Sequence, residues 1–235
     1  AISGGQFDNV ICSRCDAVVA LPKGSGRAFE AFIRELEGVL KNEYAVTDPD
    51  VTLICAAAET AKAVSAERTV TLVQALTAMP QGVEAMDTDF PGLVQTSLNM
   101  GVVKLGGDGL HIAFSIRSSI ASRKLMLAQR VRAVAALAGG TVAERGVYPG
   151  WQYKRESRFR DTLLAAYKDL TGKDGVVEAT HGGLECGLLM EKIPGLDAVS
   201  MGPELHDVHS VRERLSVPST ERTYELVCEL LRRSC

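Results

Sequence analysis

VQTSLNMGVVKLGGDGLHIAFSIRS, residues 94–118, has the clearest structural pattern in the chain. Two β-patterned runs, 94–105 and 110–118, flank a glycine-rich turn at 106–109, which predicts a β-hairpin. Because side chains alternate across a strand, the hairpin should have one apolar face and one polar face. The polar face would carry Ser97, Asn99, His111 and Arg117. Such a face is usually solvated, but it could also hold a ligand.

Residues 1–148 carry the patterns of an α+β domain built around this hairpin. Helices are predicted where apolar residues recur every three to four positions, and strands where short β-patterned runs lie between turn residues. The predicted helices cover 29–40, 65–77 and 125–137, and the predicted strands cover 16–21, 51–57 and 141–147. An antiparallel hairpin with helices on one face forms an α+β sandwich, akin to the ferredoxin-like arrangement.

Residues 149–235 are organised differently and form a second, shorter part. Helices are predicted over 159–170, over 184–190 and from 219 onward, with strands at 176–180 and 198–201. This alternation is typical of an α/β domain, in which ligands bind beyond the carboxyl ends of the strands. The segment is short for an independent α/β domain. We therefore expect the rest of its sheet to come from elsewhere.

Composition and charge restrict the classes of protein. The 235 residues carry a net charge of −3 and no basic stripe, so nucleic acid is not an expected partner. No apolar run approaches the roughly 20 residues that span a bilayer, and no secretion signal opens the chain. Six scattered cysteines fit a reducing cytoplasm better than a disulfide framework.

Cys12-Ser13-Arg14-Cys15 is a C-x-x-C motif that stands alone. A zinc knuckle would need a second pair of ligands at matching spacing, and none follows. A redox motif of the usual kind would stand at the start of a helix after a strand. The motif therefore predicts no function by itself.

Two histidines, His206 and His209, lie three residues apart after Gly202-Pro203. Neutral imidazole is a common zinc ligand, and a loop at a strand end suits such a ligand. The pair lacks the H-E-x-x-H form and a third ligand nearby, so a structural or exposed role stays open. Cys186 beside Glu185 could suggest a nucleophile, but no base is evident and packing is favoured.

Several motifs together resemble one enzyme family. They are His181-Gly182-Gly183-Leu184-Glu185-Cys186-Gly187-Leu188, residues 197–203, His209-Ser210, residues 96–103, residues 115–119, Tyr148-Pro149-Gly150-Trp151, and Ser3-Gly4-Gly5 with Asn9. They are similar to motifs of the aminoacyl-histidine dipeptidases, also called Xaa-His or cytosol non-specific dipeptidases, which are carnosinase-like. This family belongs to a superfamily of dizinc peptidases that includes carboxypeptidase G and peptidase T. The match spans nearly the whole chain.

The resemblance implies a division of the chain into a lid, residues 1–148, and the C-terminal part of a zinc peptidase catalytic domain, residues 149–235. In the family, most zinc ligands and the general-base glutamate precede the lid. By resemblance, this chain holds no catalytic residue and one metal ligand, His209, whereas His206 has no counterpart. The whole enzyme would bind two zinc ions per subunit. This chain by itself, with one ligand, would not hold zinc in catalytic geometry.

The resemblance also implies substrate contacts. Arg117 resembles the lid arginine that clamps the substrate carboxylate, and a guanidinium suits that bidentate task. Asn9 resembles a lid residue near the substrate and the developing oxyanion. Gly183 resembles a glycine that lets a backbone N–H approach the carboxylate. Glu185 would either reach the amino end of the substrate or be structural.

The chain departs from the family pattern at three positions near these residues. Val211 and Arg212 stand where a proline and an acid usually follow the His-Ser pair, and Gly182 replaces a more usual alanine. These changes concern the loop after His209 and the turn before Gly183. They leave the identities of His209 and Gly183 unchanged.

The function implied by the resemblance is hydrolysis of dipeptides of the Xaa-His type by metal-activated water. The enzyme would be cytoplasmic and would dimerise through the lid, and this chain alone would be inactive. The alternative is a non-catalytic module that dimerises and binds a small molecule through its α+β domain.

Overall fold

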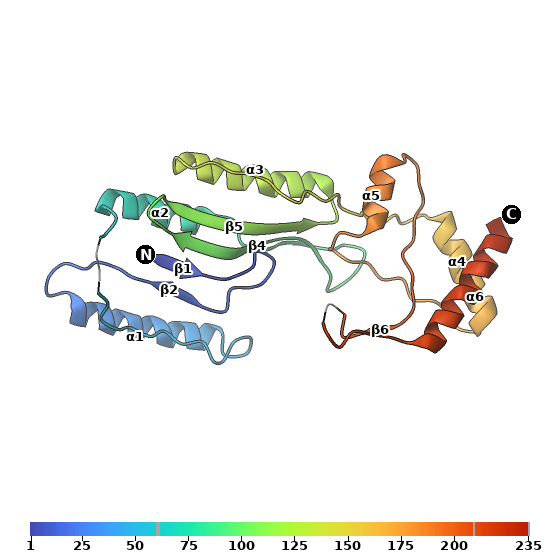
Figure 1. Ribbon diagram of the computed structural model, residues 1–235, viewed down its shortest axis with the longest axis horizontal. Coiled ribbons are helices and arrows are strands. Elements are labelled where there is room, and N and C mark those ends of the chain that lie inside the picture. Colours follow the sequence, from blue (N-terminus) through green and yellow to red (C-terminus); the bar gives the residue numbers. More distant parts are fainter. Residues whose placement is uncertain (60–61, 209, 235) are drawn as a thin grey trace. The chain divides into compact units, whose positions relative to one another are not determined.

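The computed structural model describes residues 1–59, 62–208 and 210–234, which fold into two compact units. The first unit comprises residues 1–78 and 99–115, and the second comprises residues 79–98 and 116–235. Both units combine helices with antiparallel strands (Figure 1). The predicted α+β class is confirmed.

The hairpin predicted from residues 94–118 is present and belongs to a sheet of five strands. Its strands are β4, Val94–Leu105, and β5, Leu110–Ser118, joined by a turn in which the Gly106 N–H donates to the Gly109 carbonyl at 2.9 Å. β4 also pairs with β1 at its carboxyl end and with β3, Gly82–Met86, at its amino end. β4 is therefore the strand on which the sheet is assembled.

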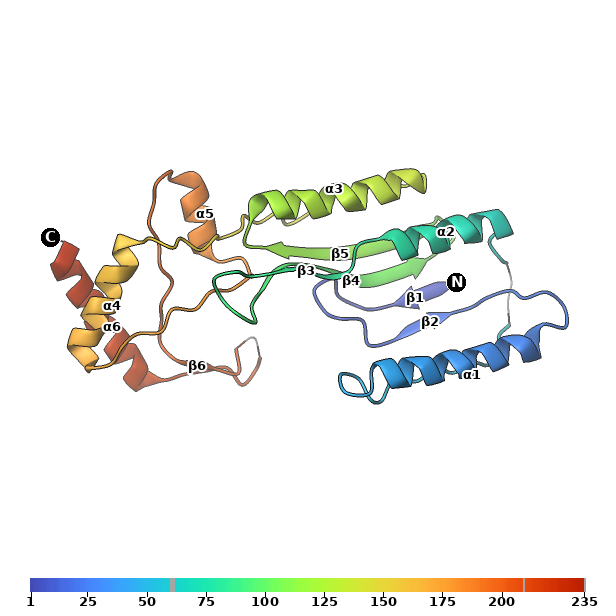
Figure 2. The same ribbon diagram turned by 180° about the vertical axis from the view of Figure 1, so that it is seen from behind.

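The first unit contains two short strands and two helices besides its share of the hairpin. β1, Ile2–Gly4, pairs antiparallel with β2, Cys15–Ala17, and with residues 103–105 of β4. α1, Gly26–Glu43, runs alongside the β1–β2 pair, and α2, Ala66–Ala78, lies against the β4–β5 hairpin (Figures 1 and 2). No residue of α1 is buried, whereas α2 buries Ala75.

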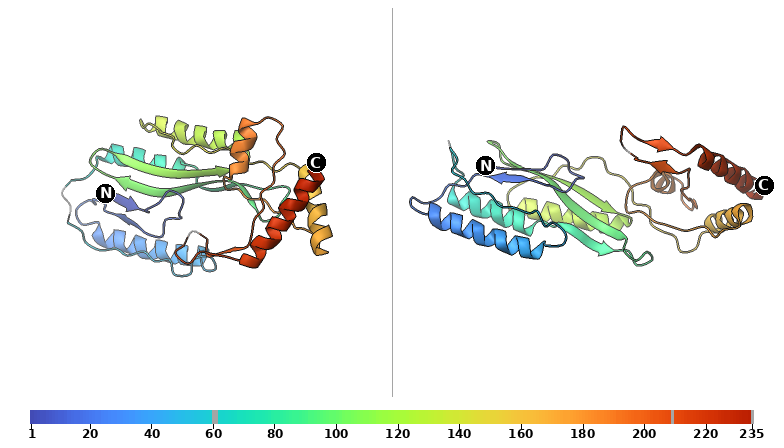
Figure 3. Two further views of the ribbon diagram at one scale, coloured as in Figure 1. Left: turned by 45° about the vertical axis from the view of Figure 1, so that its right-hand side comes forward. Right: turned by 90° about the horizontal axis from the view of Figure 1, so that it is seen from below.

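The second unit contains the other four helices and a small hairpin. These elements are α3, Ala121–Leu137, α4, Arg158–Thr171, α5, Glu185–Lys192, β6, Leu205–His206, β7, Arg214–Leu215, and α6, Val217–Ser234. α4 and α6 pack side by side (Figure 3), burying Ala166 and Leu230, and the Arg233 guanidinium of α6 bonds the Asp169 carboxylate of α4 at 2.7 Å. None of the described helices is long and apolar enough to cross a membrane.

The bounds of α4 follow from its capping residues. Ser157 lies in an extended conformation before the first turn, and its hydroxyl accepts a hydrogen bond from the Arg160 N–H. Asp197 accepts a hydrogen bond from the Ser157 hydroxyl at 2.8 Å and another from the Phe159 N–H at 3.1 Å. These bonds hold the pKa of Asp197 below its usual value, the Phe159 N–H contributing most. Gly172 ends the helix in the left-handed conformation.

Four segments predicted to be strands, 51–57, 141–147, 176–180 and 198–201, belong to no sheet in the described parts of the chain. A strand is stable only where a neighbouring backbone accepts its hydrogen bonds. The strand predicted at 16–21 is shortened to β2, and β1 and β3 were not predicted. β1 has three residues, and β3 is mostly exposed and irregular in register, so neither leaves a periodic pattern.

We predict that replacing Leu127 by Ala lowers the free energy of unfolding by about 2–5 kcal/mol, because its side chain is 0% exposed on α3 and truncation leaves a cavity. Leu125 lies on the same helix and is 52% exposed, so Leu125→Ala should change that free energy by less than about 0.5 kcal/mol. Urea unfolding of both variants checks this. Equal losses would contradict the burial of this helix face.

Candidate functional site

The segment Tyr148-Pro149-Gly150 passes close to the end of β5 in the second unit. A β-carbon on Gly150 would lie 2.7 Å from the Ser118 carbonyl oxygen and 2.6 Å from that of Ser119, so only glycine allows this approach. The Ser119 N–H in turn donates to the Gln95 carbonyl of β4 at 3.3 Å. The strand end that follows Arg117 is therefore held from two sides.

The ring of Tyr148 lies directly on Gly183. A β-carbon at Gly183 would come within 2.3 Å of Cδ1 and 2.6 Å of Cε1 of that ring. The Lys124 ammonium of α3 donates to the Tyr148 carbonyl, and burial lowers the pKa of this lysine. Tyr148 thus fixes the turn at His181-Gly182-Gly183 against the segment that also supports the end of β5.

This packing brings Arg117 and His181 together. Burial, and then the positive charge of Arg117, lower the pKa of His181 below its usual 6.5, so the imidazole is neutral at neutral pH. Arg117 is exposed and has no ion-pair or hydrogen-bond partner among the described residues. An exposed arginine beside a neutral histidine leaves its guanidinium free to bind an anionic group.

Glu185 begins α5 close to the same turn. Its side chain is exposed, and a carboxylate in the first turn of a helix interacts favourably with the helix dipole. Burial, and then the charges of Glu185 and Cys186, raise the pKa of Tyr148, which places both side chains near the phenol. The position of Glu185 agrees with either of the two roles considered for it.

Asn9 belongs to the first unit, on the loop between β1 and β2. Asn99 of β4 donates through Nδ2 to the Asp8 carbonyl at 2.7 Å and to the Val10 carbonyl at 2.9 Å, the two carbonyls that flank Asn9. A β-carbon on Gly101 would lie 2.3 Å from the Phe7 carbonyl oxygen, so the loop rests directly on β4. Asn9 is exposed in the middle of a loop that β4 holds in place.

Two residues of the predicted polar face of the hairpin, Asn99 and His111, are bonded to other groups of the protein. Asn99 bonds the loop backbone, and the His111 ring shares a hydrogen bond of 2.9 Å with the Asp108 carboxylate beside the hairpin turn. Nor is the neighbouring part of β4 solvated on either face, because Gln95 and Thr96 are both buried. The Thr96 and Ser118 hydroxyls share a buried hydrogen bond of 2.8 Å.

The histidine loop connects β6 and β7. His206 is exposed and opposite Arg214 in the ladder, and Asp207 adopts a positive φ of 53° while its carboxylate bonds Arg214 at 2.9 Å. His209, the predicted metal ligand, lies outside the described residues. Within residues 1–59, 62–208 and 210–234, no three His, Cys, Asp or Glu side chains are grouped to hold a metal ion. The described residues do not fit a zinc site by themselves.

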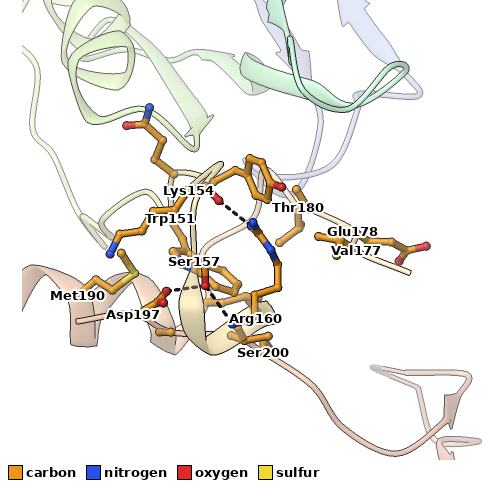
Figure 4. A pocket seen from close by; sticks show the side chains of 16 residues that line it. Trp151, Lys154, Ser157, Arg160, Val177, Glu178, Thr180, Met190, Asp197 and Ser200 are labelled. Atoms are coloured by element: carbon orange, nitrogen blue, oxygen red, sulfur yellow. Dashed lines mark hydrogen bonds between the residues drawn. The ribbon is translucent and has the colours of Figure 1, made fainter. Parts of the chain in front are cut away.

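A separate cavity of about 260 Å³ lies in the second unit beside the start of α4 (Figure 4). Arg160, which lines it, donates to the Lys154 and Arg155 carbonyls at 2.6 Å, and its guanidinium lies 4.9 Å from the Tyr153 ring centre. Residues 177–180 and 198–200, from two segments predicted to be strands, line it. None of Arg117, Gly183 and Glu185 does, so the cavity is distinct from the candidate site.

Comparison with known proteins gives relatives along the whole chain. The cytosol non-specific dipeptidase of Escherichia coli is 31% identical over 231 residues, which are 98% of this chain and 48% of that protein. The crystal structure of aminoacylhistidine dipeptidase from Vibrio alginolyticus matches with a TM-score of 0.90 and 29% identity, over 99% of this chain and 48% of that one. No protein-family model matches.

Over nearly its whole length, this chain is similar to proteins named as dipeptidases. It spans about half the length of the relatives that it matches. A crystal structure of the aminopeptidase PepT from Bacillus cereus shares the fold more loosely, with a TM-score of 0.53 and 20% identity over 69% of this chain and 44% of that one. These comparisons confirm the resemblance that the sequence motifs indicated.

The structure also identifies residues that sequence reasoning did not assign to the site. Tyr148 and Lys124 fix the turn before α5, Asn99 holds the loop of Asn9, and His181 accompanies Arg117. The histidine had a visible signal, since it precedes two glycines after a predicted strand. Nothing in the sequence pairs Tyr148 with Gly183 or Asn99 with residues 8–10, because these contacts join segments far apart in the chain.

We predict that Gly183→Ala destabilises the second unit by roughly 1–3 kcal/mol, because the new methyl group overlaps the Tyr148 ring. Gly182→Ala is a matched control, since its β-carbon would meet only the Thr180 hydroxyl, at 3.4 Å. Urea unfolding compares the two. Adding Tyr148→Ala to Gly183→Ala should cost less than the sum of the single changes, and strict additivity would contradict the contact.

We predict that the ring signals of His181 titrate in NMR spectra with a midpoint below 6.5. Arg117→Ala should raise that midpoint, because it removes a positive charge that disfavours the imidazolium, but burial should keep it below 6.5. His181→Gln assigns the signals, and Arg123→Ala, an exposed arginine on α3, is the control. An unchanged midpoint in Arg117→Ala would show that the two side chains are apart.

Proposed function

We propose that this chain supplies the substrate-carboxylate recognition of a dipeptidase, with Arg117 as the group that binds the carboxylate. The observation that carries the proposal is the exposed guanidinium of Arg117, which has no acidic partner among the described residues and stands beside His181 and the Gly183 turn. A planar guanidinium binds a carboxylate through two parallel hydrogen bonds. The relatives named as dipeptidases supply the reaction class.

His181 adds to this proposal because it is neutral. A protonated imidazole beside Arg117 would attract the carboxylate but would also repel the guanidinium and the free amino group of a dipeptide. A neutral imidazole can offer a hydrogen bond without that repulsion. Gly183, two residues further on, carries a backbone N–H in the same turn, and we propose it as a second donor to the carboxylate.

Asn9 and Glu185 are the other proposed contacts. Asn9 is exposed in the middle of its loop, where its amide could donate a hydrogen bond to the substrate carbonyl. Glu185 could accept a hydrogen bond from the substrate's ammonium group. The peptide bond would be cleaved by a general base and metal ligands that the described residues do not supply, so we expect the 235-residue chain alone to be inactive.

We also propose that the enzyme uses zinc, prefers dipeptides with a C-terminal histidine, works in the cytoplasm and forms a homodimer. One relative is named as a cytosolic enzyme and the other as an aminoacylhistidine dipeptidase. Only His209 of this chain is proposed as a zinc ligand. A second copy of the chain would cover the apolar side of α1, on which Phe32 and Val39 are exposed and no residue is buried.

We predict that Arg117→Ala lowers kcat/KM for an Xaa-His dipeptide roughly 10- to 100-fold, the cost of one charge-assisted bidentate contact. The dipeptide amide, which lacks the carboxylate, should be hydrolysed equally well by both forms. The assay uses the native protein that carries this sequence, purified from its cells, and the same protein with the substitution.

Arg117→Lys should recover part of the loss, and Arg123→Ala should leave both substrates unaffected. An equal loss on the dipeptide and on its amide would show that Arg117 acts through folding rather than through the carboxylate. No hydrolysis of any dipeptide by the native protein, with zinc supplied, would favour the non-catalytic binding module.

A further inference from the structure

The two cysteines of the C-x-x-C motif stand at the base of the loop that carries Asn9. Cys15 is paired with Gly4 in the ladder between β1 and β2, and residues 5–14 form the loop between these strands. The Gly5 N–H donates to the Arg14 carbonyl at 3.3 Å and continues this closure. Cys12 therefore lies near the carboxyl end of the loop, just before β2, which begins at Cys15.

The fold places both sulfur atoms beside Gly4. The position that a β-carbon on Gly4 would occupy is 2.9 Å from the Cys15 sulfur and 3.3 Å from the Cys12 sulfur. Both thiols are free, Cys15 is exposed and Cys12 is half-buried. The Cys12 thiol donates to the Arg14 carbonyl at 3.0 Å. Because position 4 is a glycine, no side chain separates the sulfurs.

We propose that Cys12 and Cys15 form a redox dithiol site that exchanges with low-molecular-weight disulfides. The exposed Cys15 thiolate attacks one sulfur of the disulfide, forms a mixed disulfide and releases one small thiolate. The Cys12 thiolate then attacks the Cys15 sulfur, closes the intramolecular bond and releases the second small thiolate. The two protons lost by the protein thiols end on the two released thiols, so the small disulfide is reduced and the protein is oxidised.

The surroundings of the pair favour exchange over a structural role. Closing a ring of so few residues constrains the unfolded chain little, so the bond would stabilise the fold weakly. A zinc site is not available at this loop, because the described residues offer no third ligand there. Burial, and the charges of Cys12 and Asp16, raise the pKa of the Cys15 thiol. The exchange should therefore be slow at neutral pH and quicken as the pH rises, because the thiolate is the nucleophile. In a reducing cytoplasm, the dithiol would be the resting form.

The redox site itself does not depend on the proposed dipeptidase function. The effect of its oxidation on substrate binding does rest on that proposed function. A Cys12–Cys15 bond would tie the carboxyl end of the loop whose middle is held by Asn99. The proposed substrate contact, Asn9, lies in the part of the loop that Asn99 holds, shortly before Cys12. If Asn9 binds the substrate, oxidation of the two cysteines would change substrate binding through the loop, although neither cysteine contacts the substrate.

Peptide mapping tests the site directly. The reduced chain is incubated with oxidised glutathione, its remaining thiols are alkylated, and it is digested with trypsin without reduction. Trypsin cuts after Arg14, between the two cysteines, so the bond should appear as a link between the peptide ending at Arg14 and the peptide 15–23. If the ring resists cleavage, the uncut peptide should be lighter by two hydrogen atoms.

Two cysteine variants and a measurement in urea test whether the linked peptide comes from the folded Cys12–Cys15 pair. Cys12→Ser should stop at a stable glutathione adduct on Cys15, and Cys55→Ser, which removes an exposed cysteine elsewhere, should leave the linked peptide unchanged. In urea, the equilibrium constant for closing the bond should fall, because the fold no longer holds the sulfurs together. Separate adducts on Cys12 and Cys15 in the folded chain, or an equilibrium constant unaffected by urea, would overturn the proposal.

Discussion

The backbone pairing of β4 is the constraint on which the structure depends. This strand pairs with β1, β3 and β5, and its residues also fix the two places where substrate contacts are proposed. In the first unit, Asn99 and Gly101 hold the loop of Asn9. In the second, Gln95 and Thr96 bond Ser119 and Ser118, directly after Arg117. A slip of one residue in β4 would turn the side chains of Thr96 and Asn99 to the opposite face.

Close backbone approach then determines how the second unit presents its polar groups. Gly150 lets its segment reach the end of β5, and Gly183 lets the Tyr148 ring lie on the turn before α5. These contacts leave no room for a methyl group, so the end of β5 and the turn at His181 are each held close to the Tyr148-Pro149-Gly150 segment. The result is a charged guanidinium beside a neutral imidazole, which is suited to one carboxylate.

The sequence predicted the elements whose signal is local. The hairpin at 94–118 and the six helices α1 to α6 follow from alternation, glycine turns and helical spacing. The motifs correctly indicated the relatives. The strands at 176–180 and 198–201 were not found, because a β pattern specifies a side-chain environment and not the partner that must accept the hydrogen bonds. Arg117 was singled out by resemblance, but its neighbours Tyr148 and His181 are assembled by contacts between distant segments that no local pattern encodes.

The central claim is that Arg117 receives the carboxylate of a dipeptide. A crystal structure of the native protein with a non-hydrolysable dipeptide analogue tests it most directly, through the position of the ligand's carboxylate. We predict that both carboxylate oxygens lie within hydrogen-bond distance of the Arg117 guanidinium, with the Gly183 turn beside them. A carboxylate bound by other groups, with Arg117 still exposed to solvent, would contradict the account.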